Sequence, residues 1–229
     1  EKICKIKKKY HLTLINDNCH SLGAKLDGNS KYATKYSDLV VQSFHAVKNI
    51  TSAEGGAIIT NNKKYFLNLK SFREHGFILN EKNISPWSYN MNSIGFNARL
   101  SELNCALGSS QFSKLKSNVR IRNKIASFYN KTFENTKYCK VPKVSKNNYC
   151  SYHLYPLRFD WKKIKMNKYE FYKTLKSKYG INLQIHYKPT YKFNFYKSKI
   201  KTNLKHFKNT ERFYNEVFSI PIYVGLKMK

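Results

Sequence analysis

The first sixty residues alternate between short apolar runs and polar turns, which is the pattern of a sheet built from short strands. Apolar runs at 12–16 and 39–44 predict two strands, the first of them buried. Residues 28–36 are predicted to form a loop before the second strand, and Gly55-Gly56 open a third strand at 57–60. Three strands so close along the chain indicate the core of a sheet.

Helical spacing follows. Residues 1–10 have the pattern of the last turns of a helix, and apolar residues recur at helical spacing in 63–74 until His75-Gly76 ends that helix. From Arg99 to about Phe133 the pattern is again helical, over a length that can bridge two domains. One face of this predicted helix carries Leu100, Leu103 and Leu107.

The remaining residues predict an α+β domain. We expect a strand at 153–159 and a helix at 168–179 with Gly180 as its C-terminal cap. Ile181, Leu183 and Ile185 alternate as in a strand. The pattern thus predicts an α/β protein with two domains, residues 1–133 including the bridging helix and residues 134–229.

Both ends of the sequence look cut. The chain begins inside a predicted helix without an initiator Met, and it stops at GLKMK without the closing helix usual for such a domain. We therefore expect further sequence on both sides.

The charge is strongly positive, with 43 Lys+Arg against 13 Asp+Glu and a net charge of +30. Such a balance suggests an anionic partner such as nucleic acid. The basic residues are spread along the whole chain, however, which favours a compositional bias with lysine at solvated positions. A basic binding module therefore stays as the alternative to an enzyme.

Cysteine and hydropathy patterns indicate a cytosolic protein. The five Cys form no CxxC pair, which argues against a disulfide framework or a zinc ribbon, and no metal site is expected. No run approaches the roughly 20 apolar residues of a membrane span.

The segment after the second predicted strand suits a lysine that forms an imine. Lys48 stands five residues after Ser43 and six before the acidic residue of an EGG turn. Pyridoxal phosphate (PLP) must be held at its phosphate while its aldehyde reacts with an amine, and Ser43 can supply the hydroxyl. Asp17 follows the first strand, where ligands bind in open α/β sheets and a carboxylate can meet a pyridine nitrogen. Taken singly, Lys48 reads as a solvated lysine and Asp17 as an ordinary strand-end Asp.

Several ordered motifs resemble the DegT/DnrJ/EryC1/StrS family of sugar aminotransferases, and the likeness runs nearly end to end. The family has the type I PLP aminotransferase fold, with a large domain built on a mainly parallel sheet and a small α+β domain. The motifs are DNCHSLGA (17–24), YSDLVVQSFHAVKNITSAEGG (36–56), FREHG (72–76), PWSYNMNSIGFNARLSELNCALGSSQ (86–111), HLYPL (153–157), HYKP (186–189) and SIPIY (219–223).

The resemblance implies a role for each matching residue. Lys48 matches the Schiff-base lysine, Asp17 the partner of the pyridine nitrogen, and Ser43 a phosphate ligand. His20 matches the position beside the ring's phenolic oxygen. Asn97 matches an asparagine that reaches the phosphate of the neighbouring subunit's cofactor, which implies a homodimer with shared active sites. Alternatively, Asn97 caps the helix that follows.

The resemblance also implies a substrate class. The lysine segment and HYKP are most similar to members that aminate C4 of a UDP-linked 4-keto-6-deoxy N-acetyl sugar, with glutamate as donor, for pseudaminic acid. Members that aminate a UDP-4-keto-pentose for lipid A modification are the alternative. We expect the sugar nucleotide to contact Arg99, His186, Tyr187 and Lys188, although Arg99 can also pair with Glu102.

The sequence departs from the family pattern in two ways. Asn16 stands where the family commonly has Glu, and Asn18-Cys19 replace two small residues. The glycine-rich helix start that cradles the phosphate, and an aromatic residue that stacks on the ring, belong to an upstream part of the family. We therefore expect these 229 residues on their own to be inactive, and a remnant that only dimerises is a further alternative.

Overall fold

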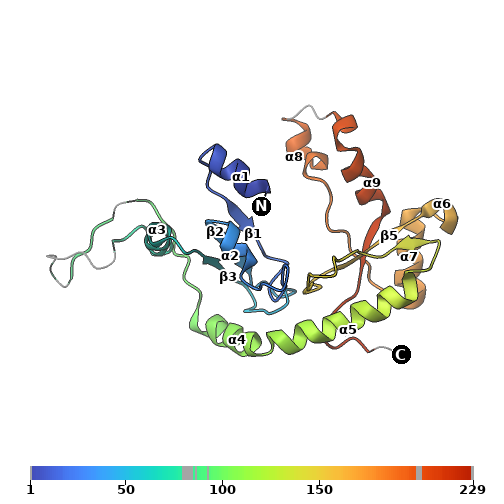
Figure 1. The fold of residues 1–229 in the computed structure, drawn as a ribbon, viewed down its shortest axis with the longest axis horizontal. Coiled ribbons are helices and arrows are strands. Elements are labelled where there is room, and N and C mark those ends of the chain that lie inside the picture. Colours follow the sequence, from blue (N-terminus) through green and yellow to red (C-terminus); the bar gives the residue numbers. More distant parts are fainter. Residues whose placement is uncertain (1, 79–84, 86, 92, 200–202, 228–229) are drawn as a thin grey trace. The chain divides into compact units, whose positions relative to one another are not determined.

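The structure is a computed structural model that describes residues 2–78, 85, 87–91, 93–199 and 203–227. The chain divides into two compact units (Figure 1). The first comprises Glu1–Lys116 and Asn147–Tyr149, and the second comprises Ser117–Lys146 and Cys150–Lys229. The domain boundary predicted near Phe133 stays a prediction.

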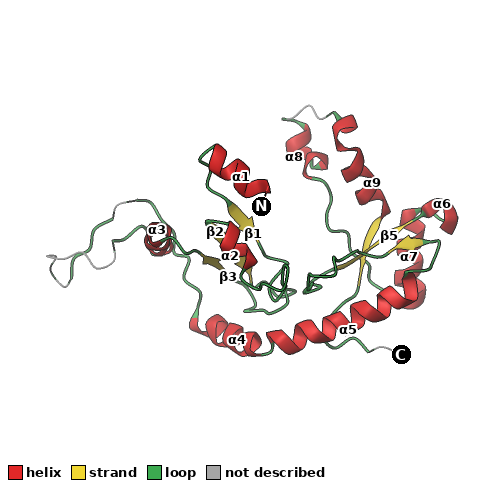
Figure 2. Ribbon diagram, in the orientation of Figure 1, coloured by secondary structure: helices red, strands yellow, loops and turns green. Residues whose placement is uncertain are grey.

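The first unit contains a three-stranded sheet in the order β1-β2-β3 (Figure 2). Its strands are β1 (Ile15–Asp17), β2 (Leu39–Ser43) and β3 (Gly56–Ile59). Strands β1 and β2 are parallel, with Asp17 beside Val41, whereas β3 is antiparallel to β2. Because β1 and β2 run the same way, Asp17 and Ser43 end the two strands at one edge of the sheet.

The predicted second and third strands are confirmed, but the expectation of a buried first strand is wrong. Strand β1 covers only Ile15–Asp17, and Leu12 and Ile15 are 52 % and 58 % exposed. Among the described residues it is an outer strand of its sheet, and its apolar side chains are not covered on the faces of that sheet.

The described residues of the first unit also form four helices. They are α1 (Lys2–Lys9), α2 (Tyr32–Tyr36), α3 (Lys63–Arg73) and α4 (Glu102–Ser113). Helix α3 confirms the prediction at 63–74, with Asn62 as its N-cap and positive φ at His75 and Gly76 after its end. The loop predicted at 28–36 is wrong in part, because its second half forms α2.

The long helix predicted from Arg99 to Phe133 is two helices, α4 and α5 (Leu115–Phe133). Ser101 caps the start of α4, and the backbone N–H of Lys114 bonds to the carbonyls of Gln111 and Phe112 at its end. This local turn interrupts the helical ladder before α5 begins. The predicted apolar face is not buried within this chain, since Leu103 is 83 % exposed.

The second unit is built on an antiparallel sheet in the order β4-β5-β6. Its strands are β4 (Cys139–Lys140), β5 (Tyr155–Phe159) and β6 (Val217–Ile220). Alternate residues of β5 are buried, as expected for a strand with one face on a core. Besides α5, the unit contains α6 (Trp161–Ile164), α7 (Lys168–Tyr179), α8 (Asn194–Lys197), α9 (Lys208–Glu216) and the 3-10 turns Thr190–Lys192 and Leu204–Phe207.

Helix α7 is confirmed at both ends. Asn167 and Glu170 form a reciprocal capping box at its start, and Gly180 has a left-handed backbone with φ of 66° after its last turn. The strand predicted at 181–185 is wrong. Only Gln184 pairs with β6, through both backbone bonds to Ser219, while Leu183 is buried in the core. The alternation of apolar residues at 181–185 thus reflects the burial of side chains and not the pairing of a strand.

Helices of the described residues are too short or too polar to cross a membrane.

Candidate functional site

Two polar side chains stand at the carboxyl ends of neighbouring parallel strands. Asp17 ends β1, and its Oδ1 accepts the backbone N–H of Cys19 at 3.1 Å. Ser43 ends β2, and its Oγ accepts the backbone N–H of His45 at 3.4 Å. This edge is the place where open α/β sheets bind ligands. The fold therefore brings together a carboxylate and a hydroxyl that are far apart in the sequence.

The loop between β2 and β3 carries Lys48 and is fixed at both ends. The N–H of Phe44 bonds to the carbonyl of Gly55 at 2.8 Å, and the carbonyl of Phe44 accepts the N–H of Ser52 at 2.9 Å. Inside the loop, the N–H of Lys48 bonds to the carbonyl of His45 at 3.0 Å. Lys48 is half-buried. These bonds fix the backbone from which the Lys48 side chain extends.

The residue after Lys48 anchors the loop to the Asp17 segment. Asn49 is buried, and its Nδ2 donates to the carbonyl of Leu22 at 3.0 Å. Ser52, which is completely buried, closes the far side of the loop. Both segments of the candidate site are thereby joined by a direct hydrogen bond.

Electrostatics also connects Asp17 with Lys48. Hydrogen bonds from Cys19 lower the pKa of Asp17 most, and the charges of His20 and Lys48 lower that pKa further. Asp17 is exposed in this chain, so burial does little to oppose these effects. The Asp17 carboxyl is therefore ionised at neutral pH, and the charge of Lys48 is one of the causes of its lowered pKa.

A glycine lets the segment just before helix α4 approach the lysine loop. Gly55 has φ of 142°, and a Cβ there would lie 2.7 Å from Cδ1 of Leu100 and 2.7 Å from Oγ of Ser52. Next to it, Nδ2 of Asn104 in α4 donates to the carbonyl of Glu54 at 3.3 Å. The EGG turn is thus a contact point between the loop and α4.

Asn97 and Arg99 lie on a different segment of the first unit. Asn97 is exposed and forms an isolated β-bridge with Glu74, at the end of α3. Arg99 forms its ion pair with Glu74. The pairing of Arg99 with Glu102 that its spacing allowed is therefore not the one found, because the end of α3 packs beside Arg99. Neither residue has a described contact with Asp17, Ser43 or Lys48.

His186, Tyr187 and Lys188 belong to the second unit. Nδ1 of His186 is 2.8 Å from Oγ of Ser219, and the Tyr187 side chain is 62 % exposed. The Lys188 ammonium lies 5.4 Å from the ring centroid of Phe193. Their predicted role in substrate binding stays a prediction.

Comparison with known proteins decides the family. The model of the DegT/DnrJ/EryC1/StrS aminotransferase family matches residues 1–229. The chain belongs to this family. The resemblance inferred from the sequence motifs is therefore confirmed.

Two relatives refine the likeness. A Campylobacter jejuni protein named UDP-4-amino-4,6-dideoxy-N-acetyl-beta-L-altrosamine transaminase is 38 % identical over 229 residues, covering 100 % of this chain and 58 % of the relative. The solved structure of Helicobacter pylori PseC, an aminotransferase involved in pseudoaminic acid biosynthesis, has a TM-score of 0.87 and 32 % identity over 99 % of this chain and 58 % of PseC. The chain thus spans somewhat over half the length of these relatives.

A more distant structure supports the fold alone. Bacillus subtilis NtdA with bound cofactor PMP matches with a TM-score of 0.77 and 24 % identity, over 99 % of this chain and 49 % of NtdA. The predicted α/β aminotransferase fold is confirmed by these likenesses. A mainly parallel sheet was expected for this fold. In the described part of the first unit the sheet has one parallel pair, β1 with β2, and one antiparallel pair, β2 with β3.

The DegT/DnrJ/EryC1/StrS family depends on PLP, and the residues of this chain fit that cofactor. Asp17 offers an ionised carboxylate for a protonated pyridine nitrogen, Lys48 a half-buried amine, and Ser43 a hydroxyl donor for phosphate. All three belong to one edge of one sheet and the loop that leaves it. The donor set therefore matches the two chemically different ends of PLP.

Two residues of the site were missed by the sequence analysis. Cys19 contacts the Asp17 carboxylate, and Asn49 ties the lysine loop to the Asp17 segment. The position of Cys19, two residues after a strand-end Asp, is the signal of a turn in which the carboxylate accepts a backbone N–H. No comparable local signal points to Asn49, since its partner Leu22 is distant in sequence.

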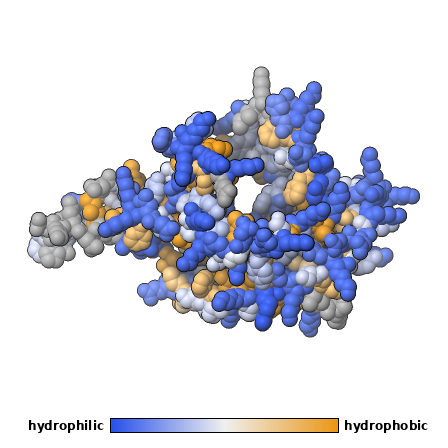
Figure 3. Space-filling view, in the orientation of Figure 1, coloured by the Kyte–Doolittle hydropathy of each residue, from blue (hydrophilic) through white to orange (hydrophobic). Residues whose placement is uncertain are grey.

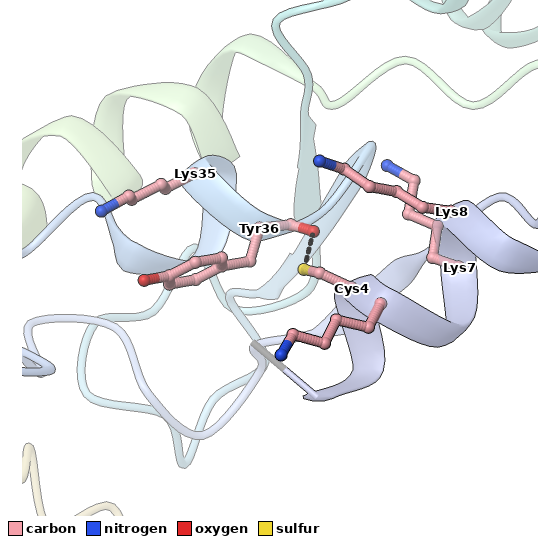
Figure 4. A pocket seen from close by; sticks show the side chains of 6 residues that line it. Cys4, Lys7, Lys8, Lys35 and Tyr36 are labelled. Atoms are coloured by element: carbon pink, nitrogen blue, oxygen red, sulfur yellow. Dashed lines mark hydrogen bonds between the residues drawn. The ribbon is translucent and has the colours of Figure 1, made fainter.

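A small pocket lined mainly by lysines lies next to α1 (Figure 4). Its volume is about 390 Å³, and it is lined by Cys4, Lys5, Lys7, Lys8, Lys35 and Tyr36. The Cys4 thiol points to the Tyr36 carbonyl at 3.2 Å, and Lys7 pairs with Asp38 at 2.6 Å. These contacts attach α1 to α2 and β2. Elsewhere hydrophilic residues cover much of the visible surface of both units (Figure 3), in agreement with charge spread along the chain.

Proposed function

We propose that the protein is a PLP-dependent aminotransferase that acts on a nucleotide-linked 4-keto sugar. The observation that carries the proposal is geometric: Asp17 ends one of two parallel strands, the Lys48 loop leaves the same end of the other, and Asn49 ties that loop to the segment after Asp17. In a chain with 43 Lys+Arg, Lys48 is half-buried and belongs to a loop that a hydrogen bond ties to the Asp17 segment. The two relatives above support the assignment.

PLP, when bound, supplies an electron sink that withdraws charge from the reacting carbon of the substrate. Asp17 has one task, which is to keep a proton on the ring nitrogen, because an opposite charge nearby favours the protonated pyridinium. Ser43 Oγ would donate a hydrogen bond to the phosphate and so help to orient the ring. His20 stands beside Asp17 and is proposed to face the phenolic oxygen of the ring.

Lys48 has two tasks. Its Nζ would hold the cofactor covalently, and once an amino substrate had displaced it, the free amine would carry a proton between the substrate carbon and the cofactor carbon. The hydrogen-bonded loop limits the positions that Nζ can reach. Accurate placement of this amine is what a proton transfer between two fixed carbons requires.

For the substrate, we propose a UDP-linked 4-keto-6-deoxy N-acetyl sugar, aminated at C4 with glutamate as donor. The names of the relatives support this choice over a UDP-4-keto-pentose. Arg99, His186, Tyr187 and Lys188 are proposed to contact the sugar nucleotide, since cations and ring hydroxyls suit a diphosphate. A cytoplasmic location would give access to such nucleotide sugars.

We also propose a homodimer in which Asn97 reaches the phosphate of the partner's cofactor. Large apolar side chains surround Asn97 in sequence and are strongly exposed in this chain. They are Trp87 at 83 %, Ile94 at 84 %, Phe96 at 61 % and Leu103 at 83 % exposed. Large apolar side chains that are exposed along one stretch of the chain are the kind of surface that a second subunit can cover.

The test uses the complete gene product with Lys48→Ala and, as a matched control, Lys63→Ala, which removes an exposed lysine of α3. After addition of PLP, we expect a visible absorption band and a borohydride-reduced adduct that peptide mapping places on Lys48. Lys48→Ala should lose both and at least about a hundredfold in transamination rate, because the proton-transfer group is gone. Lys63→Ala should retain them. If Lys48→Ala keeps the band and the adduct, the aminotransferase proposal fails and salt-dependent nucleic-acid binding becomes the next property to measure.

A further inference from the structure

A buried serine of β6 contacts the imidazole of His186, one of the residues proposed above to meet the sugar nucleotide. Oγ of Ser219 lies 2.8 Å from Nδ1 of His186. Ser219 is only 4 % exposed, whereas His186 is half-buried. The contact thus joins a core position of the second unit to a ring that solvent can reach in part.

The backbone of Ser219 is fixed on both sides. Strand β5 lies on one side, with Pro156 opposite Ser219. On the other side, the N–H of Gln184 bonds to the carbonyl of Ser219 at 3.1 Å, and the N–H of Ser219 bonds to the carbonyl of Gln184 at 2.7 Å. Gln184 precedes His186 by two residues, so these bonds also hold the segment that carries the imidazole. Replacement of Ser219 by Ala keeps all of them and removes only the hydroxyl.

Two contacts orient the imidazole. Besides Ser219, the ring of Tyr187 lies edge-to-face with it, at 4.8 Å between centroids and an interplanar angle of 87°. The hydrogen bond at one ring nitrogen also determines which nitrogen carries the proton of a neutral imidazole. Because Ser219 engages Nδ1, a ligand that bonds to this ring meets it at Nε2.

We infer that Ser219 is a positioning residue for His186, whose hydroxyl holds the imidazole for contact between Nε2 and the diphosphate of a sugar nucleotide. This inference rests on the proposed function, which gives His186 its contact with the substrate. An anion accepts a hydrogen bond, so Nε2 carries the proton and Nδ1 of the neutral ring accepts the Ser219 hydroxyl. Ser219 itself touches no ligand and acts through His186. Without the hydroxyl, the ring can occupy further rotamers, and only some of them present Nε2 as before.

The experiment measures binding of uridine diphosphate to the complete gene product by titration calorimetry. Ser219→Ala should raise Kd about threefold to tenfold, the effect of one hydrogen bond that is no longer in place. Ser145→Ala, which removes an exposed loop serine of the same unit, is the matched control and should leave Kd unchanged. In a His186→Ala background, Ser219→Ala should have no further effect on Kd, because residues that act through one contact are not additive.

A purely structural role of Ser219 would give a different result. It would weaken binding by the same factor with or without the His186 ring, and such additive losses would overturn the inference. An unchanged Kd in Ser219→Ala, or a wild type that does not bind uridine diphosphate, would overturn it as well.

Nitrogen NMR of labelled histidine tests the contact without any ligand. In the neutral ring of His186 we expect the proton on Nε2, and Ser219→Ala should shift the Nδ1 resonance while Ser145→Ala does not. A proton found on Nδ1 of the neutral ring would overturn the inference. The proposed function fails by a separate result, which is a wild type that forms no Lys48-dependent PLP adduct.

Discussion

Replacement of Arg122 by Ala should strongly destabilise the second unit. Arg122 lies in α5 and is only 6 % exposed. Its Nη1 donates to the carbonyls of Ile222 at 2.8 Å, Tyr152 at 3.0 Å and His153 at 3.4 Å. The guanidinium thus joins α5 to the segment before β5 and to the segment after β6, and burial lowers its pKa.

The magnitude follows from these contacts. A buried carbonyl that loses its partner costs about 1–3 kcal/mol. The two shorter bonds, to Ile222 and Tyr152, therefore predict a loss of about 2–6 kcal/mol in the free energy of unfolding. Removal of a buried charge returns part of its desolvation cost, which brings the expected loss to about 3 kcal/mol. This is a large share of the roughly 5–15 kcal/mol that stabilises a folded domain.

The assay is denaturant unfolding followed by tryptophan fluorescence. Trp161 reports on the second unit, because its ring packs on Phe159 and Phe171 and its Nε1 donates to the Asn215 carbonyl at 2.7 Å. Arg120→Ala is the matched control, since it removes an exposed arginine of the same helix. Arg122→Lys should fall between wild type and Arg122→Ala, because one ammonium can still reach some of the carbonyls. Equal stabilities for Arg120→Ala and Arg122→Ala would refute the reasoning.

Two further predictions concern the backbone and a half-buried lysine. Gly76→Ala should cost roughly 2–4 kcal/mol, because φ is 86° there and a Cβ would lie 1.7 Å from the Ser93 carbonyl oxygen. Gly180→Ala, where φ is 66° and nothing lies within 4 Å, should cost only about 1 kcal/mol, and equal unfolding midpoints for the two variants would contradict this. Burial lowers the pKa of Lys168 to about 8, so the unfolded chain binds more protons between about pH 8 and 10 and stability should rise with pH in that window. Denaturation of wild type and Lys168→Met across this range should show a difference in unfolding free energy that changes with pH. A difference that stays constant would contradict the lowered pKa of Lys168.

The sequence by itself determined the features that depend on near neighbours. Helices α3 and α7 and strand β2 were predicted within a residue or two, because capping groups and apolar periodicity act over a few positions. The motif around Lys48 could also be recognised from the sequence, and it indicated the family that the comparison confirmed.

Tertiary structure decided which groups meet. Arg99 pairs with Glu74 rather than Glu102, since its partner is chosen by the packing of α3 and not by helical spacing. Apolar and polar residues alternate at 181–185 as in a strand, but only Gln184 forms a bridge to β6. Such an alternation shows which side chains are buried, and it does not show that the backbone pairs with another strand. The contact of Asn49 with Leu22 arises only when two loops fold onto each other.

The same distinction applies to the candidate site. The sequence supplied Asp17 and Lys48 as chemical types, whereas the parallel pairing of β1 and β2 placed the carboxylate at the edge from which the lysine loop leaves. Spacing along the chain cannot specify that placement, because it depends on which strands pair and in which register.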